Sequence, residues 1–222
     1  MASVSNMHHL QTSSAFCYHV GMPQKHGTKL LRLAEAQPAV SARELTAAGV
    51  PQRVLSRMAA RGHLHRVGRG LYTGAEASPS AHQSVIEVTK QAPKAVVCLL
   101  SALEIHEVGV QAPFEVWIAL PAGTHAPKST VAAIRVTRLS GAAFSEGIET
   151  VVLDGAPVRV YCLAKTITDC FTLRSKVGLD VALEALREGW NARKVTMDDL
   201  ARYAKVNRMT NVMRPYLEAL TG

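Results

Sequence analysis

The chain has 222 residues, of which 48% are hydrophobic, so it can form one large domain or two small ones and is too apolar for wholesale disorder. Its formal net charge is +8 and its pI is about 9.6, which favours polyanionic partners without saying which. The charge is concentrated, because residues 23–72 hold nine basic and two acidic residues (+7), whereas residues 73–222 hold 16 and 15 (+1). A solvated surface that binds no partner is not expected to gather its positive charge in one segment, so residues 23–72 are predicted to bind nucleic acid.

The cysteines do not form a metal-binding pattern. Cys17, Cys98, Cys162 and Cys170 include no CxxC pair, and their spacings match no zinc module. Reduced thiols, without metal or cofactor, are therefore expected. The N-terminus lacks the basic and apolar segments of a signal peptide, and the longest apolar run, residues 95–100, is far shorter than a membrane span. We expect a soluble cytoplasmic protein.

Composition and charge divide the chain into three regions. Residues 1–26 are rich in Ser, His and Met without a clear period, and we expect a flexible extension there. Residues 27–80 and 81–222 are predicted as two domains, because the net charge changes after residue 72 and a polar stretch follows over residues 73–80.

Three short helices are expected at the start of the first domain. Thr28 is placed to cap the first helix, and Ser41 and Glu44 form a capping box for the second, which ends at Gly49. Pro51 suits the first turn of a third helix, which runs to residue 61. Two short helices joined by a tight turn that contains glycine are typical of a helix-turn-helix.

The third helix has a polar face suited to DNA. Val54, Leu55 and Met58 share the side that should pack inward. The other side carries Gln52, Arg53, Ser56, Arg57 and Arg61. In the major groove Arg reads guanine and Gln reads adenine, so these residues, with Arg43 of the second helix, are predicted to contact DNA.

A small hairpin is predicted over residues 63–72, where apolar and polar residues alternate around two glycines. Arg66 and Arg69 lie at its tip and are expected to bind phosphate or to enter a minor groove. Three helices followed by a hairpin give the order of a winged helix. The alternative is an amphipathic helical hairpin with a basic surface.

The second domain is predicted to mix helices and strands, most strands coming first. Its expected elements are helices over 81–90 and 95–108, strands over 114–120 and 134–139, a hairpin of 150–153 and 158–162, and helices over 163–174, 180–190, from 196 onward and over 209–220. Asp154-Gly155 marks the hairpin turn, and Thr196 with Asp199 has capping-box spacing. The fold class predicted for the whole chain is α+β.

The second domain contains no catalytic motif, and we predict that the protein is not an enzyme. Its most distinctive polar group is Lys165, Thr166 and Asp169. Lys165 and Asp169 are four residues apart on one helix, so we interpret them as a surface ion pair, and the alternative is a polar site that contacts DNA or a partner. A second, weaker basic strip is predicted from Arg135, Arg138, Arg159 and Lys165.

Several segments together resemble the AbiEi-type antitoxin family. Residues 61–72, RGHLHRVGRGLY, are similar to the wing of these proteins. The rest of the family is matched by the segments at residues 116–121, 155–161, 164–169, 178–186 and 213–220. The resemblance spans roughly residues 27–220 and does not include the N-terminal extension.

The resemblance implies an N-terminal winged helix and a C-terminal antitoxin domain. Members of this family bind inverted repeats in their own promoters and repress them. They also counter a nucleotidyltransferase-type toxin encoded beside them, without a stable complex, as type IV antitoxins. By this resemblance the protein is expected to be a monomer or weak dimer that pairs on double-stranded DNA.

Two other classes of function remain open at this point. One is an enzyme that acts on nucleic acid through the second domain, although no paired carboxylates or metal cluster are evident there. The other is an orphan winged helix that contacts protein and has no toxin partner. The concentration of charge in residues 23–72 argues against the latter, because a protein-binding winged helix need not be so basic.

Overall fold

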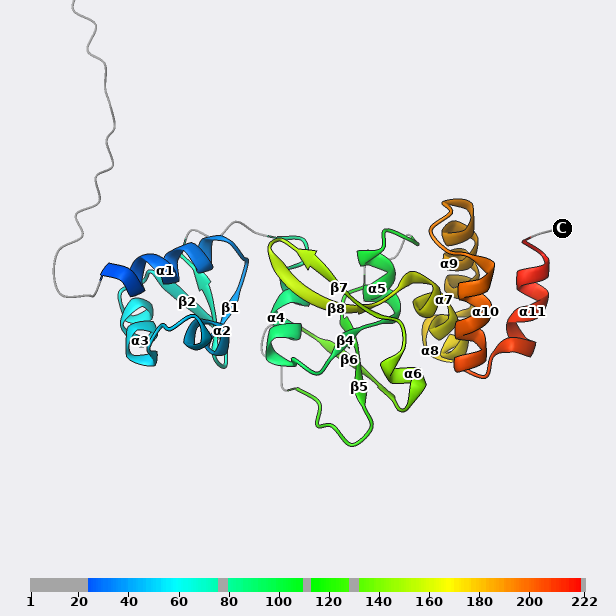
Figure 1. The fold of residues 1–222 in the computed structure, drawn as a ribbon, viewed down its shortest axis with the longest axis horizontal. Helices are drawn as coiled ribbons and strands as arrows, with labels where there is room; N and C mark the ends of the chain where they lie inside the picture. The colour runs from blue at the N-terminus through cyan, green and yellow to red at the C-terminus, as the bar shows by residue number, and fades with distance from the viewer. Residues whose placement is uncertain (1–23, 76–79, 110–112, 128–131, 221–222) are drawn as a thin grey trace, which may run out of the picture.

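The computed structural model describes residues 24–75, 80–109, 113–127 and 132–220 (Figure 1). It belongs to the predicted α+β class and is organised by a three-stranded and a five-stranded sheet. The small sheet and three helices lie at one end, the larger sheet lies in the middle, and α9–α11 lie at the other end (Figure 1). Residues 1–23, most of the predicted extension, are outside the described part of the chain.

The first unit follows the predicted order of helices and hairpin. Its elements are α1 (Gln24–Glu35), β1 (Val40–Ser41), α2 (Ala42–Ala47), α3 (Gln52–Ala60), β2 (Leu64–Gly68) and β3 (Leu71–Gly74). Two details differ from the prediction. Helix α1 begins at Gln24, so Thr28 is not its cap, and residues 24–26 belong to this helix rather than to the extension. Strand β1 was not predicted, because two residues are too few to show an alternation.

The capping box at the start of α2 is confirmed. The Ser41 hydroxyl accepts a hydrogen bond from the Glu44 backbone N–H at 3.2 Å, and the Glu44 carboxylate accepts one from the Ser41 N–H at 2.7 Å. Gly49 then turns the chain with a φ of 81°. Pro51 is the N-cap of α3 rather than its first residue.

We expect Ser41→Ala to lower the free energy of unfolding by about 0.5–2 kcal/mol, because one backbone N–H of α2 loses its acceptor. Urea unfolding of the full chain measures this cost. Ser56→Ala is the matched control, since the Ser56 hydroxyl only donates to the Gln52 carbonyl on an exposed helix face. A Ser41→Ala cost no greater than that of Ser56→Ala would contradict a stabilising role for the box.

The two faces of the small sheet pack against different parts of the chain. Val40, Leu64 and Tyr72 join the core formed with α1–α3. Ala39 and Leu71, the neighbours of Val40 and Tyr72 along the chain, instead join a core with residues of the second unit. Successive strand residues point to opposite faces, so the second unit covers the face of the sheet that α1–α3 leave open.

The five-stranded sheet has the order β6-β5-β4-β8-β7. Its strands are β4 (Val96–Val97), β5 (Val116–Pro121), β6 (Ile134–Leu139), β7 (Ile148–Leu153) and β8 (Ala156–Tyr161). The β4–β8 and β5–β6 pairs are parallel, and the others are antiparallel. The predicted hairpin around Asp154-Gly155 is confirmed as β7–β8.

The predicted helix over residues 95–108 is wrong at its start, over residues 95–98. Val96 and Val97 form the central strand β4, and α5 covers only Leu99–Ile105. Leu99 has a positive φ of 48°, where the chain changes from strand to helix. A short apolar run does not distinguish a buried strand from a buried helix, and here pairing with β5 and β8 decides.

Helices surround the larger sheet. They are α4 (Gln83–Gln91), α5, α6 (Ala142–Ser145), α7 (Leu163–Thr172), α8 (Arg174–Val177), α9 (Leu179–Asn191), α10 (Met197–Val206) and α11 (Thr210–Glu218). The predicted cap of α10 is confirmed, since Thr196 accepts from the Asp199 N–H at 3.1 Å. Every residue of α7 from Leu163 to Phe171 is buried, which makes α7 the centre of the C-terminal core.

Gly155 lies where the β7–β8 turn meets the first unit. Its φ is +78°, and a Cβ there would overlap the carbonyl oxygen of Ala36. We expect Gly155→Ala to cost about 1–3 kcal/mol of unfolding free energy, from backbone strain and loss of this close contact. Gly123→Ala is the control, because Gly123 has a φ of +80° and open space around it. Equal costs in thermal unfolding would mean that the contact with Ala36 contributes nothing.

Candidate nucleic-acid interface

Helix α3 presents the polar face that the sequence predicts. Val54, Leu55 and Met58 are buried in the core of the first unit. The residues predicted to contact DNA from this helix are all exposed: Gln52, Arg53, Ser56, Arg57 and Arg61. Gln52 and Arg53 begin the helix, Ser56 lies at its middle, Arg57 lies in its last turn, and Arg61 is its C-cap. The exposed face is therefore free to approach a large partner.

Arg43 lies in the first turn of α2, directly before Glu44 of the capping box, and is also exposed. Its position depends on how α2 begins, because the box fixes the backbone there. Arg43 and the arginines of α3 come from two consecutive helices that pack on each other.

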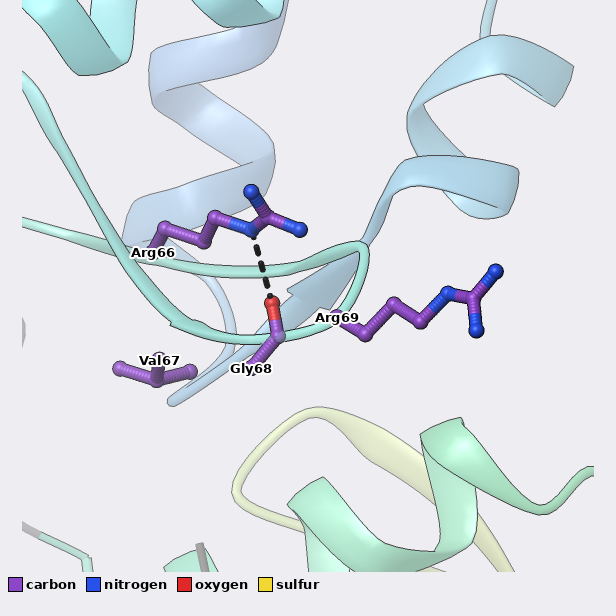
Figure 2. Close-up of a pocket in the computed structure, with 4 residues that line it drawn as sticks. All are labelled: Arg66, Val67, Gly68 and Arg69. Atoms are coloured by element: carbon purple, nitrogen blue, oxygen red, sulfur yellow. Dashed lines mark hydrogen bonds between the residues drawn. The ribbon is translucent and has the colours of Figure 1, made fainter. Parts of the chain in front are cut away.

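The hairpin carries both predicted arginines, but only Arg69 lies in the turn, whereas Arg66 lies on β2 opposite Tyr72. β2 and β3 are antiparallel, with a bulge between Arg66 and Gly68. The Arg66 Nε donates to the Gly68 carbonyl at 3.2 Å, which leaves the end of the guanidinium exposed (Figure 2). Figure 2 also shows Arg69 extending away from the turn, while Val67 points to the other side of the hairpin from Arg66. These residues line an open hollow of about 380 Å³, which suits an anionic group.

The predicted second basic strip is not formed. Lys165 is fully buried, so it cannot contribute to a surface. Arg135 is bound to Glu115 at 2.6 Å and stacks over the Trp117 ring. Arg135 and Arg138 belong to the edge strand β6, whereas Arg159, half-buried, lies three strands away on β8. Arg138 also donates to the Thr124 carbonyl. The four residues therefore share no continuous surface.

The interpretation of Lys165 and Asp169 as a surface ion pair is also wrong. The Lys165 Nζ contacts both Asp169 carboxylate oxygens, at 2.5 and 2.6 Å, and Asn207 at the end of α10 donates to the same carboxylate. Burial raises the pKa of Asp169, and the contacts with Lys165 and Asn207 offset this only in part. Thr166, also buried, donates to the Tyr161 carbonyl. Such an enclosed group links α7 to α10 and is inaccessible to DNA or to a partner.

A hollow of about 540 Å³ lies among α5, β7, α7 and α10. Its polar groups are mostly engaged with the protein itself. The His106 Nε2 is 2.8 Å from the Tyr161 carbonyl, and Lys194 donates to the His106 and Glu107 carbonyls. Burial, with a hydrogen bond to Cys162, raises the pKa of Tyr203 to about 12. These hydrogen bonds hold neighbouring segments of the chain together. No pattern in the sequence predicted the residues that line this hollow.

Cys98, Cys162 and Cys170 are free thiols, and Cys17 lies outside the described residues. Burial raises the pKa of both Cys98 and Cys170. In the described ranges, no group of three or more His, Cys, Asp or Glu side chains is arranged to hold a metal ion. Nor is any helix of that part of the chain long and apolar enough to cross a membrane.

The structure defines an α+β chain whose N-terminal unit joins three helices to a small sheet and exposes several arginines. Residues 29–73 match the family model described as transcriptional regulator, AbiEi antitoxin. The resemblance to the AbiEi-type family is thereby confirmed for this part of the chain, which extends from within α1 to within β3. No curated protein matches the sequence.

A solved structure supports the fold beyond this segment. The crystal structure of the RV2827C protein from Mycobacterium tuberculosis is similar, with a TM-score of 0.53. The likeness covers 82% of this chain and 71% of that one, at 14% sequence identity. At this sequence identity the likeness shows a similar arrangement of helices and strands and does not indicate a shared activity.

Proposed function

We propose that the protein is a sequence-specific DNA-binding repressor that acts on its own promoter. The observation that carries this proposal is the exposed polar face of α3, which begins with Gln52 and Arg53 at the N-terminus of the helix, with the arginines of the hairpin in the same unit. In helix-turn-helix proteins this part of the second helix contacts base edges in the major groove. The family match over residues 29–73 agrees with a regulatory role.

The proposal assigns different roles to the two elements. Gln52, Arg53, Ser56 and Arg57 read bases, and Arg66 and Arg69 bind the backbone or a minor groove. Family members bind inverted repeats, so two copies of this chain are expected to pair on one operator as monomers or a weak dimer.

As its second role, we propose that the protein is the antitoxin of a type IV system, countering a nucleotidyltransferase-type toxin without a stable complex. This role rests on the family match alone. Because a regulator of its own promoter must reach the DNA, the protein is proposed to act in the cytoplasm. Neither proposed role requires the protein to catalyse a reaction. Co-expression with the product of a neighbouring nucleotidyltransferase-like gene tests this part, since growth should be restored only when the antitoxin is present.

Salt dependence tests the binding surface itself. If about five of the nine basic residues in the first unit neutralise phosphates, log K should fall against log salt with a slope of about −4 to −5. Fluorescence anisotropy with labelled promoter DNA measures this slope. A slope near zero would exclude the basic unit as the surface that binds DNA.

A further inference from the structure

Helix α4 connects the two units. It contacts β1 and β3 of the small sheet and β4, β5 and β8 of the larger one. Its residues Val85, Ile86 and Val88 are buried in the same apolar cluster as Ala39 and Leu71. The rear face of the small sheet is therefore part of a core that continues into the second unit, although the sequence suggests a boundary near residue 80.

The same side of the first unit contacts the second unit at two further points. The turn at Gly155 lies against the carbonyl oxygen of Ala36, closely enough to leave no space for a Cβ. Next to it, the Ser80 hydroxyl donates to the Asp154 carboxylate. The loop between α1 and β1 and the start of the second unit are thus both fixed to the β7–β8 turn.

Lys90 of α4 makes the polar part of this attachment. Its Nζ donates to the Glu44 carboxylate at 2.7 Å and to the Gln37 side-chain oxygen at 2.6 Å, and only 8% of its side chain is exposed. The other Glu44 oxygen closes the capping box of α2. Burial alone would raise the pKa of Glu44, but the hydrogen bonds from Lys90 and Ser41 outweigh it and hold this pKa below its usual value.

These contacts reach both elements of the proposed DNA-binding surface. Glu44 directly follows Arg43 in the first turn of α2, and α2 packs on α3. Val67 and Leu71, on either side of the turn that holds Arg69, pack against the core shared with the second unit. The hairpin and the helices are therefore held by one common support.

We propose that the second unit holds the hairpin and the helix pair in their DNA-binding arrangement, with Lys90 as a positioning residue that acts through Glu44. This inference rests on the proposed DNA-binding function. A helix and a hairpin that contact one duplex must keep a fixed separation, and a support formed before binding avoids the entropy cost of ordering them on the DNA. Lys90 itself is proposed to make no contact with DNA.

The test compares Lys90→Met with Lys94→Met in the full chain. Lys94 is exposed just beyond α4, so both variants lose one positive charge. Two quantities are measured, amide hydrogen exchange of residues 41–48 and affinity for the protein's own upstream DNA at one salt concentration. We expect Lys90→Met to speed exchange in α2 and to weaken binding by about fivefold or more, the lower end of typical coupling between sites. Lys94→Met should show only the small effect of its lost charge.

A second variant makes the test independent of the folding of Lys90→Met. Glu44→Gln removes the charged partner of Lys90 but retains a side chain that can close a capping box. It also makes the protein more positive, so general electrostatics predict tighter DNA binding, whereas loss of positioning predicts weaker binding. Tighter binding by Glu44→Gln, with exchange in α2 unchanged, would overturn the proposal.

The outcome separates this proposal from the proposed function. If the wild-type chain binds its upstream DNA and Lys90→Met matches Lys94→Met in both quantities, the positioning role is wrong while DNA binding remains. If the wild-type chain binds no DNA, the proposed function is wrong. The positioning role of Lys90 is then wrong as well, whatever the hydrogen exchange in α2 shows.

Discussion

Asp169→Ala should lower the free energy of unfolding by about 3–5 kcal/mol, because it leaves the Lys165 ammonium buried without its partner. The Lys165 side chain is 0% exposed, and the Asp169 side chain is 4% exposed. Removing one member of such a pair costs more than the pair itself contributes, since the remaining charge cannot reach water. Urea unfolding of the full chain, with circular dichroism, measures the change.

Two comparisons isolate the cause. Glu146→Ala removes the partner of Arg202 in an exposed pair and should cost less than about 1 kcal/mol. The double variant Lys165→Met with Asp169→Leu should regain much of the lost stability, because it removes both charges and keeps the volume apolar. An Asp169→Ala cost as small as that of Glu146→Ala would show that the buried pair is not critical to the fold.

Arg57→Ala should weaken binding to the operator by about 1–3 kcal/mol while changing binding to random DNA much less. Arg57 is exposed on α3 opposite the buried Met58 side, where a bidentate contact to guanine is expected. Such a contact discriminates between bases, so its loss should also blur the preference at one base pair. Competition titrations with single-base operator variants measure this effect.

Arg69→Ala provides the contrast. This residue lies in the hairpin turn, where we propose a backbone contact (Figure 2). Its loss should weaken binding to operator and random DNA alike and reduce the salt slope by about one unit. If Arg57→Ala weakens both DNAs equally while Arg69→Ala abolishes only the operator preference, the roles are reversed and the hairpin is the reading element.

Local patterns predicted the parts of the fold that depend on neighbouring residues. Ser41 and Glu44 lie three residues apart, and the bonds between them could be foreseen from that spacing. The same holds for Thr196 at α10 and for the turn at Asp154-Gly155. The inward and outward faces of α3 also follow from helical spacing alone, which is why its exposed residues could be named in advance.

The parts that sequence could not predict depend on distant partners. Val96 and Val97 become a strand because β5 and β8 flank them. Lys165 and Asp169 are buried in the surrounding core, and the Asp169 carboxylate is bound by Asn207, 38 residues further along the chain. Their helix is buried on every side although it carries Lys165, Thr166 and Asp169, so polar side chains in this helix did not mark the surface of the protein. Lys90 likewise meets Glu44 across 46 residues, and no local pattern connects them.

A comparison of two DNA duplexes tests whether the N-terminal unit binds DNA sequence-specifically. One is the sequence upstream of the gene, and the other has the same composition in shuffled order. We expect the purified full chain to bind the upstream duplex at least about 10³-fold more tightly at physiological salt, the lower end for specific regulators. Equal affinity for the two duplexes would show that the protein does not bind its upstream sequence specifically.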